Sequence, residues 1–212
     1  MIESKELNIV TNGDDINEVL DEAESFAKNL KLNVKQTMHI RLLTEEIMVL
    51  VNQLTGEPDM RLSFRGDAEK CCIHLEIDTW LDNTTKNNLL SVSKSGVNES
   101  AKGFLGKIRD SIENILLMSD KDIIGSEAYS NDFVMMGLSV NSSFVLDTHI
   151  NGTEFWTLQD YRERVENDKE DSDEARFAYE ELEKSVLANL ADDIKIGIKG
   201  THVEVDIIKN LK

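Results

Sequence analysis

The chain has 212 residues, of which 40% are hydrophobic and 30% are charged, so it can bury a core in a folded domain. Its 41 aspartates and glutamates outnumber its 23 lysines and arginines, which gives a formal net charge of −18. Such a surface repels nucleic-acid phosphates and anionic lipid, so we expect neither a nucleic acid nor a membrane as partner. The first residues do not read as a signal peptide, and no segment has the roughly 20 apolar residues of a membrane helix. The two cysteines are neighbours and poorly placed to pair with each other, so the sequence shows no disulfide framework. We therefore expect a cytoplasmic protein.

The N-terminal part of the sequence predicts a short strand followed by two helices. Residues 6–10 (ELNIV) read as the strand, and turn-forming residues follow it. Apolar residues then recur every three or four positions over residues 14–30 and again over residues 34–54. That spacing is typical of amphipathic helices, and Gly56 and Pro58 end the second one.

The two strands of a hairpin are predicted next, over residues 61–65 and 71–78, joined through Gly66 and Asp67. Apolar and polar residues alternate in both strands, which is typical of strands with one buried face. The polar face of the second strand holds Cys72, His74, Glu76 and Asp78. We expect His74 and Glu76 to be an exposed pair rather than an acid–base dyad.

The middle of the chain is less regular. Helical spacing is clearest over residues 101–118 and is also present over residues 84–92 and 157–165. Alternation of apolar and polar residues predicts a further strand pair over residues 133–140 and 143–150.

The C-terminal part predicts one helix over residues 173–191 and then a hairpin that turns at Gly200. Because helices do not alternate singly with strands, this order favours an α+β fold, a two-layer sandwich with helices packed on one face of a mixed, mainly antiparallel sheet. We find no internal repeat and no linker-like segment. We therefore expect a single domain over residues 1–212, with a large insertion over residues 82–172.

The order and lengths of these elements resemble the GHKL ATPase fold, which histidine kinases, gyrase-type ATPases and large heat-shock chaperones share. The likeness is greatest to its small branch of serine kinases and anti-sigma factors. LNIV, the two helices, RLSFR and CCIHLEID match the first half of that fold, and LEKSVLANLADDIKIGIKGTHVEVDIIKNL matches its closing helix and hairpin. The resemblance implies a site for ATP or ADP, with the predicted insertion in the lid region.

The second helix carries the first motif of the family. Glu45 stands where the family has the acid that activates the attacking water, so the resemblance implies a catalytic role for Glu45. Four residues on, Val49 stands where the family has the asparagine that holds magnesium. A hydrocarbon side chain cannot coordinate a hard cation that requires oxygen ligands, so we expect no metal-binding residue at this position.

Two further motifs concern the nucleotide itself. Asp78 stands where the family has the aspartate that binds the adenine amino group, but Trp80 and Asp82 replace the glycines that follow it. The family also has a glycine-rich turn before a helix, which places backbone N–H groups at the phosphates. The candidates for that role lie in the locally basic stretch SKSGVNESAKGFLGKIRD and are Gly103, Gly106 and Lys107.

These departures from the family pattern leave two interpretations of function. In the first, the chain is an ATP-binding-like regulatory protein with little or no turnover, because phosphoryl transfer depends on positioning and charge neutralisation. In the second, the fold has lost nucleotide chemistry and acts as a protein-interaction module. We expect a protein partner, we leave self-association as a homodimer open, and an unrelated α+β enzyme is a third alternative.

Overall fold

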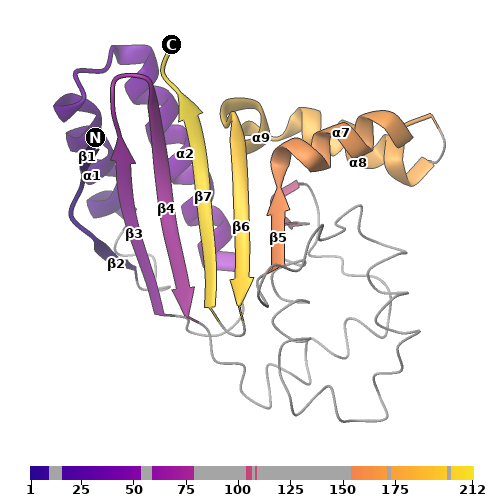
Figure 1. The fold of residues 1–212 in the computed structure, drawn as a ribbon, viewed down its shortest axis with the longest axis horizontal. Helices are drawn as coiled ribbons and strands as arrows, with labels where there is room; N and C mark the ends of the chain where they lie inside the picture. The colour runs from indigo at the N-terminus through magenta and orange to yellow at the C-terminus, as the bar shows by residue number, and fades with distance from the viewer. Residues whose placement is uncertain are drawn as a thin grey trace, which may run out of the picture.

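A computed structural model describes most of the two ends of the chain and a small part of its middle. The residues that it describes are 1–9, 16–53, 59–78, 104–106, 108, 154–170, 173–199 and 202–212. Figure 1 shows one open sheet with helices behind it and two more helices beyond one edge. The helices are α1 (Ile16–Asn29), α2 (Val34–Gln53), α7 (Leu158–Asp168), α8 (Asp173–Lys184) and α9 (Val186–Leu190).

The described strands form a seven-stranded sheet in the order β1-β3-β4-β7-β6-β5, and β2 also pairs with β3. These strands are β1 (Ile2–Glu3), β2 (Leu7–Ile9), β3 (Asp59–Gly66), β4 (Lys70–Asp78), β5 (Glu154–Thr157), β6 (Asp193–Lys199) and β7 (His202–Asn210). Every pairing among them is antiparallel, where the sequence analysis expected a mixed sheet. The predicted α+β class is confirmed, and the final hairpin joins the first through the pairing of β4 with β7.

The core lies between the sheet and the helices. The alternation of β4 turns Ile73, Leu75 and Ile77 towards the helices, where they are buried in one cluster with Ile40 and Ile47 of α2. Burying a side chain of this size stabilises the fold by about 2 kcal/mol relative to leaving it exposed. The opposite face of β4 is polar, as its sequence predicts, and Figure 1 looks onto that face.

The predicted turn between β3 and β4 is confirmed and is held locally. Asp67 Oδ1 accepts hydrogen bonds from the backbone N–H groups of Glu69 and Lys70, at 3.0 and 3.3 Å. Gly66 precedes this turn, and a Cβ atom placed on it would lie 2.9 Å from the carbonyl oxygen of Lys70. Only glycine allows the two strands to approach this closely here.

The prediction of one helix over residues 173–191 is wrong, because the helix is interrupted at Ser185. The Ser185 backbone is extended (φ −76°, ψ 124°), and its hydroxyl accepts a hydrogen bond from the Ala188 N–H at 3.2 Å. A serine hydroxyl competes in this way with the helical hydrogen bond and begins a new helix. Arg162 of α7 then donates to the carbonyl oxygens of Ala188 and Ala191 at the end of α9.

Part of the expected insertion over residues 82–172 belongs to the sheet layer. Residues 154–157 form β5, which the sequence did not predict and which pairs with β6, and the helix predicted over 157–165 is confirmed as α7. Thr157 is the N-cap of α7 and accepts a hydrogen bond from the Asp160 N–H at 3.1 Å. The predictions over residues 84–92, 133–140 and 143–150 lie outside the described residues.

A small aromatic cluster joins this region to the core. Residues 104–106 and 108 are helical, within the helix predicted over 101–118. The Phe104 ring lies 6.3 Å from Trp156 and 5.8 Å from Tyr161, measured between ring centroids, and all three side chains are buried. Among the helices described, none combines the length and the apolar character needed to cross a membrane.

Candidate functional site

The same five-residue pattern, H-x-E-x-D, occurs in β4 and in β7. In β4 it consists of His74, Glu76 and Asp78, and in β7 of His202, Glu204 and Asp206. The two strands are antiparallel, and the register pairs His74 with Asp206, Glu76 with Glu204 and Asp78 with His202. The six side chains are therefore related by a local two-fold axis, and we call them the polar ladder.

The first half of the polar ladder holds His74 between two carboxylates. His74 Nδ1 lies 2.6 Å from Asp206 Oδ1, and His74 Nε2 lies 3.2 Å from Glu76 Oε1. An imidazole can donate to two carboxylates only when both ring nitrogens carry a proton. The hydrogen bond to Asp206 raises the pKa of His74 above 6.5, although burial of the ring acts in the opposite direction. His74 is only 8% exposed, so the expectation of an exposed pair is wrong.

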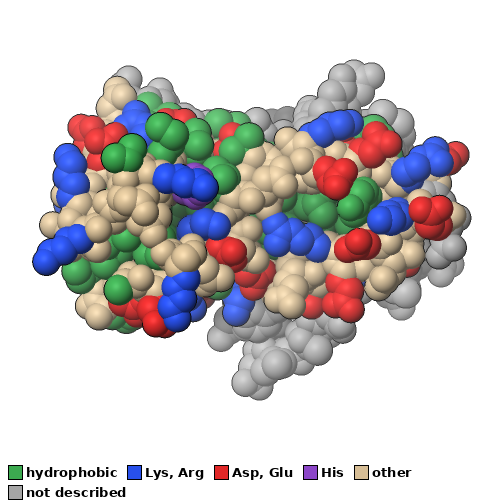
Figure 2. Space-filling model, turned by 90° about the horizontal axis from the view of Figure 1, so that it is seen from above, with side chains coloured by type: hydrophobic (Ala, Val, Ile, Leu, Met, Phe, Trp, Pro, Cys, Tyr) green, Lys and Arg blue, Asp and Glu red, His purple; other side chains and the backbone are tan. Residues whose placement is uncertain are grey.

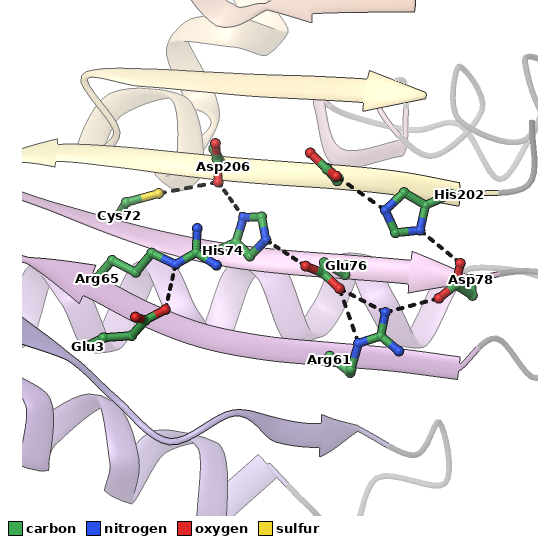
Figure 3. Close-up of polar contacts among 10 residues, drawn as sticks. Glu3, Arg61, Arg65, Cys72, His74, Glu76, Asp78, His202 and Asp206 are labelled. Atoms are coloured by element: carbon green, nitrogen blue, oxygen red, sulfur yellow. Dashed lines mark hydrogen bonds and ion pairs between the residues drawn. The ribbon is translucent and has the colours of Figure 1, made fainter. Parts of the chain in front are cut away.

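The second half repeats this arrangement with the strands exchanged. His202 Nδ1 lies 2.8 Å from Asp78 Oδ1, and His202 Nε2 lies 3.3 Å from Glu204 Oε1. The hydrogen bond to Asp78 raises the pKa of His202 as well. Figure 3 shows both rings lying on the face of the sheet away from the helices, each between carboxylates of β4 and β7.

An arginine of β3 binds two carboxylates on one side of the polar ladder. Arg61 Nη2 lies 2.8 Å from Glu76 Oε2 and 3.1 Å from Asp78 Oδ2, so one guanidinium joins the two halves. The hydrogen bond from Arg61 is the main reason that the pKa of Glu76 is lowered. Arg65 lies further along β3 and is bonded to Glu3 of β1 at 2.9 Å.

The two cysteines lie on opposite faces of β4 and are not activated. Cys72 is on the polar face, and its Sγ donates to Asp206 Oδ1 at 3.4 Å. Cys71 is buried in the core. Burial raises the pKa of each thiol to about 12, so neither is a thiolate near neutral pH.

The two carboxylates of the predicted nucleotide site lie on opposite sides of the sheet. Glu45 is on α2, where Arg41 Nε bonds its Oε1 at 3.2 Å, and Arg41 also bonds Glu24 of α1. Asp78 is on the face turned away from α2, bonded to Arg61 and His202. The structure therefore does not bring Glu45 and Asp78 together.

The other predicted site residues are described only in part. Gly106 lies buried in the helical residues 104–106, while Gly103 and Lys107 are outside the described residues. Val49, at the expected magnesium position, is 43% exposed on α2. Within the described ranges, no group of three or more His, Cys, Asp and Glu side chains could hold a metal ion.

Comparison of the chain with family models, with curated proteins and with solved structures gives no match in any of the three. The resemblance to the GHKL fold thus rests on the element order and the motifs of this sequence. Sequence reasoning missed Arg61, His202, Glu204 and Asp206 as members of one site. The repeated H-x-E-x-D pattern in two predicted strands was the signal that could have found the last three. As it stands, the polar ladder can take up and release protons at two imidazoles.

Proposed function

We propose that this chain is a regulatory protein-binding module whose layout resembles the GHKL ATPase fold and which does not turn over nucleotide. The observation that carries the proposal is the position of Glu45 and Asp78 on opposite sides of the sheet. The element order and the joining of both hairpins in one sheet support the resemblance in layout.

Nucleotide hydrolysis requires a base and the bound nucleotide within hydrogen-bonding distance of the same water. A nucleotide whose adenine was held by Asp78 would be on the other side of β4 from Glu45. Each carboxylate is also already engaged, Glu45 by Arg41 and Asp78 by Arg61 and His202. The geometry therefore favours the protein-interaction interpretation over the catalytic one.

The polar ladder supports a binding role because its charged side chains are held in fixed positions. Groups that are already ordered lose little conformational freedom when a partner binds, and fixed charges select a partner of complementary charge. The outer carboxylate Glu204 is more than half exposed in its side chain and is accessible to such a partner.

The nucleotide half of the proposal is tested by thermal unfolding with ATP or ADP and magnesium at millimolar concentration. A bound nucleotide raises the unfolding midpoint by mass action on the native state. We expect no shift and no phosphate release. A shift that is lost in Asp78→Asn would overturn this half of the proposal and support the nucleotide-binding alternative.

The partner half is tested by capture from the source cell with the wild type and two charge-reversed variants. Glu204→Lys changes the exposed edge of the polar ladder, and Glu163→Lys is the matched control on the exposed surface of α7. We expect a specific protein to be retained by the wild type and by Glu163→Lys but lost with Glu204→Lys. Recovery of no specific protein, or equal recovery by all three, would contradict the proposal.

A further inference from the structure

Helix α2 carries apolar side chains on its outer face as well as on the face that packs against the sheet. Val34, Met38 and Val49 are 82%, 57% and 43% exposed, and Leu42 between them is partly buried. Their spacing of four and seven residues places them in one stripe along the helix, in which Glu45, bonded to Arg41, lies between Leu42 and Val49. Figure 2 views the end of the molecule where α2 begins, and it shows hydrophobic side chains interspersed with lysines and arginines. We call these four side chains the α2 stripe.

Two side chains of opposite charge lie along one side of the α2 stripe, near its two ends. Lys35 is exposed in the first turn, and Glu46 is 11 residues further along, about 16 Å away in a helix. Within the part of the chain that the structure describes, no hydrogen bond or ion pair engages either side chain. Glu46 is partly buried, and that burial together with its neighbour Glu45 raises its pKa, as expected of a carboxylate that lacks a cation.

Near neutral pH the positive charge beside the start of the α2 stripe is that of Lys35, because the neighbouring His39 ring is neutral there. His39 lies one turn after Lys35, and its pKa is lowered by burial and then by Lys209 and Lys35. The outer side of α2 therefore changes from positive near Lys35 to negative near Glu46. A surface with a positive charge near one end of an apolar stripe and a negative charge near the other end is complementary to a copy of itself that runs antiparallel.

We propose that the chain forms a homodimer in which the α2 stripe packs antiparallel against the α2 stripe of a second copy. A two-fold axis near Leu42 would place Val34 beside Val49 of the second copy. The same axis brings Lys35 towards Glu46 of the second copy, and symmetry makes this ion pair twice. Antiparallel packing also sets the opposite ends of the two helix dipoles side by side. The inference goes beyond the proposed function and does not depend on it.

The occupant is a second copy rather than an anionic membrane or an acidic protein, because either of those would satisfy Lys35 and leave Glu46 without a cation. The net charge of −18 on each copy opposes approach over long distances. At physiological ionic strength the Debye length is about 8 Å, so this repulsion is largely screened while contacts in the interface remain. The test is therefore made at that ionic strength.

The test is sedimentation equilibrium over a dilution series up to about 100 μM, which gives the solution mass and the dissociation constant of the dimer. We expect a mass twice the chain mass of 24.0 kDa for the wild type. Lys35→Glu alone and Glu46→Lys alone should each weaken the dimer at least about tenfold, because each places like charges opposite each other twice. An equimolar mixture of these two variants should recover the dimer, since both facing pairs in the mixed dimer again consist of one acidic and one basic side chain.

Two further variants and one spectrum complete the design. Met38→Glu should give the monomer by placing a charge in the apolar contact, and Phe177→Ser, on the exposed surface of α8, should leave the dimer unchanged. Circular dichroism verifies that each variant is folded. A monomeric wild type, a Glu46→Lys dimer whose dissociation constant equals that of the wild type, or a mixture that binds no more tightly than either variant alone would overturn the proposal. None of these outcomes involves nucleotide or an outside protein, so they are distinct from failure of the proposed function.

Discussion

Glu76 of β4 and Glu204 of β7 are directly opposite each other in the register of the sheet. Like charges in this position destabilise an antiparallel strand pair. Here each carboxylate is bonded to the histidine two residues before it in its own strand, at 3.2 Å for Glu76 and 3.3 Å for Glu204. The stability of the pairing between β4 and β7 therefore depends on the charge of two imidazoles.

We expect the thermal midpoint to fall as the pH rises above 6.5 because of His74. Its pKa is raised above the unfolded value of 6.5, so its stabilisation is complete below pH 6.5 and is lost as the pH rises through the folded pKa. His74→Gln removes a charge-assisted pair and should cost about 2 kcal/mol at pH 6. The loss should shrink as the pH rises through the folded pKa of His74, as measured by chemical denaturation at each pH.

The matched control is His39→Gln, because the pKa of His39 is lowered rather than raised. The contribution of His39 to stability therefore changes with pH in the opposite direction. A group whose folded pKa is lowered stabilises the fold above pH 6.5, and this effect is lost as the pH falls through the folded pKa. A wild-type midpoint that is flat above pH 6.5, or a His74→Gln loss that does not change with pH, would contradict the role given to His74.

His202 should contribute less than His74, although both rings are held by two carboxylates. The His202 side chain is 35% exposed against 10% for His74, so water screens its ion pairs more strongly. We expect His202→Gln to cost under about 1 kcal/mol and to be the more sensitive to added salt. Proton NMR of the two ring signals should show both titrating above pH 6.5, and a larger loss from His202→Gln than from His74→Gln would refute this order.

The carboxylates of the polar ladder set the acid limit of this stabilisation. The pKa values of Glu76 and Asp206 are lowered, mainly by hydrogen bonds from Arg61 and His74 respectively. Their stabilisation is present above the ordinary values of 4.5 and 3.8 and is lost as the pH falls through the folded pKa values. The polar ladder therefore stabilises the fold most from about pH 4.5 to pH 6.5, where the carboxylates are ionised and the imidazoles are protonated.

Lys31→Gly should stabilise the protein by about 1 kcal/mol. Lys31 follows α1 with a φ of 56°, a left-handed conformation that favours glycine. The capping hydrogen bonds are already present, from the Lys31 N–H to the Lys28 carbonyl at 2.9 Å and from the Leu32 N–H to the Ala27 carbonyl at 3.0 Å. Glycine keeps these bonds and removes the strain on the backbone. Urea denaturation measures the change in the free energy of unfolding.

Lys28→Gly is the control for that substitution. Lys28 lies in the last turn of α1 itself, where glycine costs conformational entropy, so it should destabilise by about 1 kcal/mol. If Lys28→Gly and Lys31→Gly changed the free energy of unfolding in the same direction, backbone strain would not be what distinguishes the two positions.

Gly66→Ala should destabilise the protein by about 1 to 3 kcal/mol. The added methyl group would lie 2.9 Å from the Lys70 carbonyl oxygen and 3.1 Å from Cys71 Cα, and backbone atoms cannot move aside without disturbing the turn. The free energy of unfolding gives the cost. Amide exchange at Asp67, whose N–H donates to the Lys70 carbonyl at 2.9 Å, gives its location. An unchanged stability and exchange rate would show that the turn has room to relax.

Local periodicity predicted the elements whose signals lie within single segments. The apolar spacing of α1 and α2 and the alternation in β3, β4, β6 and β7 are such signals, and each of these elements is present. The break at Ser185 was missed because the apolar spacing continues across it, and it depends on a hydroxyl whose role is set by the surrounding structure. β5 is only four residues long and depends on its pairing with β6.

The candidate site was less predictable because it depends on which distant strands are neighbours. The alternation of β4 correctly placed Asp78 on the polar face, but no local pattern shows that His202 lies opposite it. By contrast, the alternation of β4 and the packing of the helices on its apolar face already place Glu45 and Asp78 on opposite sides of the sheet. The pairing of β4 with β7, which brings His202 to Asp78, joins positions more than 120 residues apart.

The neighbouring thiols in β4 offer a way to observe how the sheet comes apart. Both have a pKa of about 12, so an alkylating reagent at neutral pH modifies them only after their surroundings loosen. Cys72 becomes reactive when its contact with Asp206 is released, whereas Cys71 requires the helical layer to separate from the strands. The order in which mass spectrometry detects the two modifications would record which side of the sheet opens to solvent first.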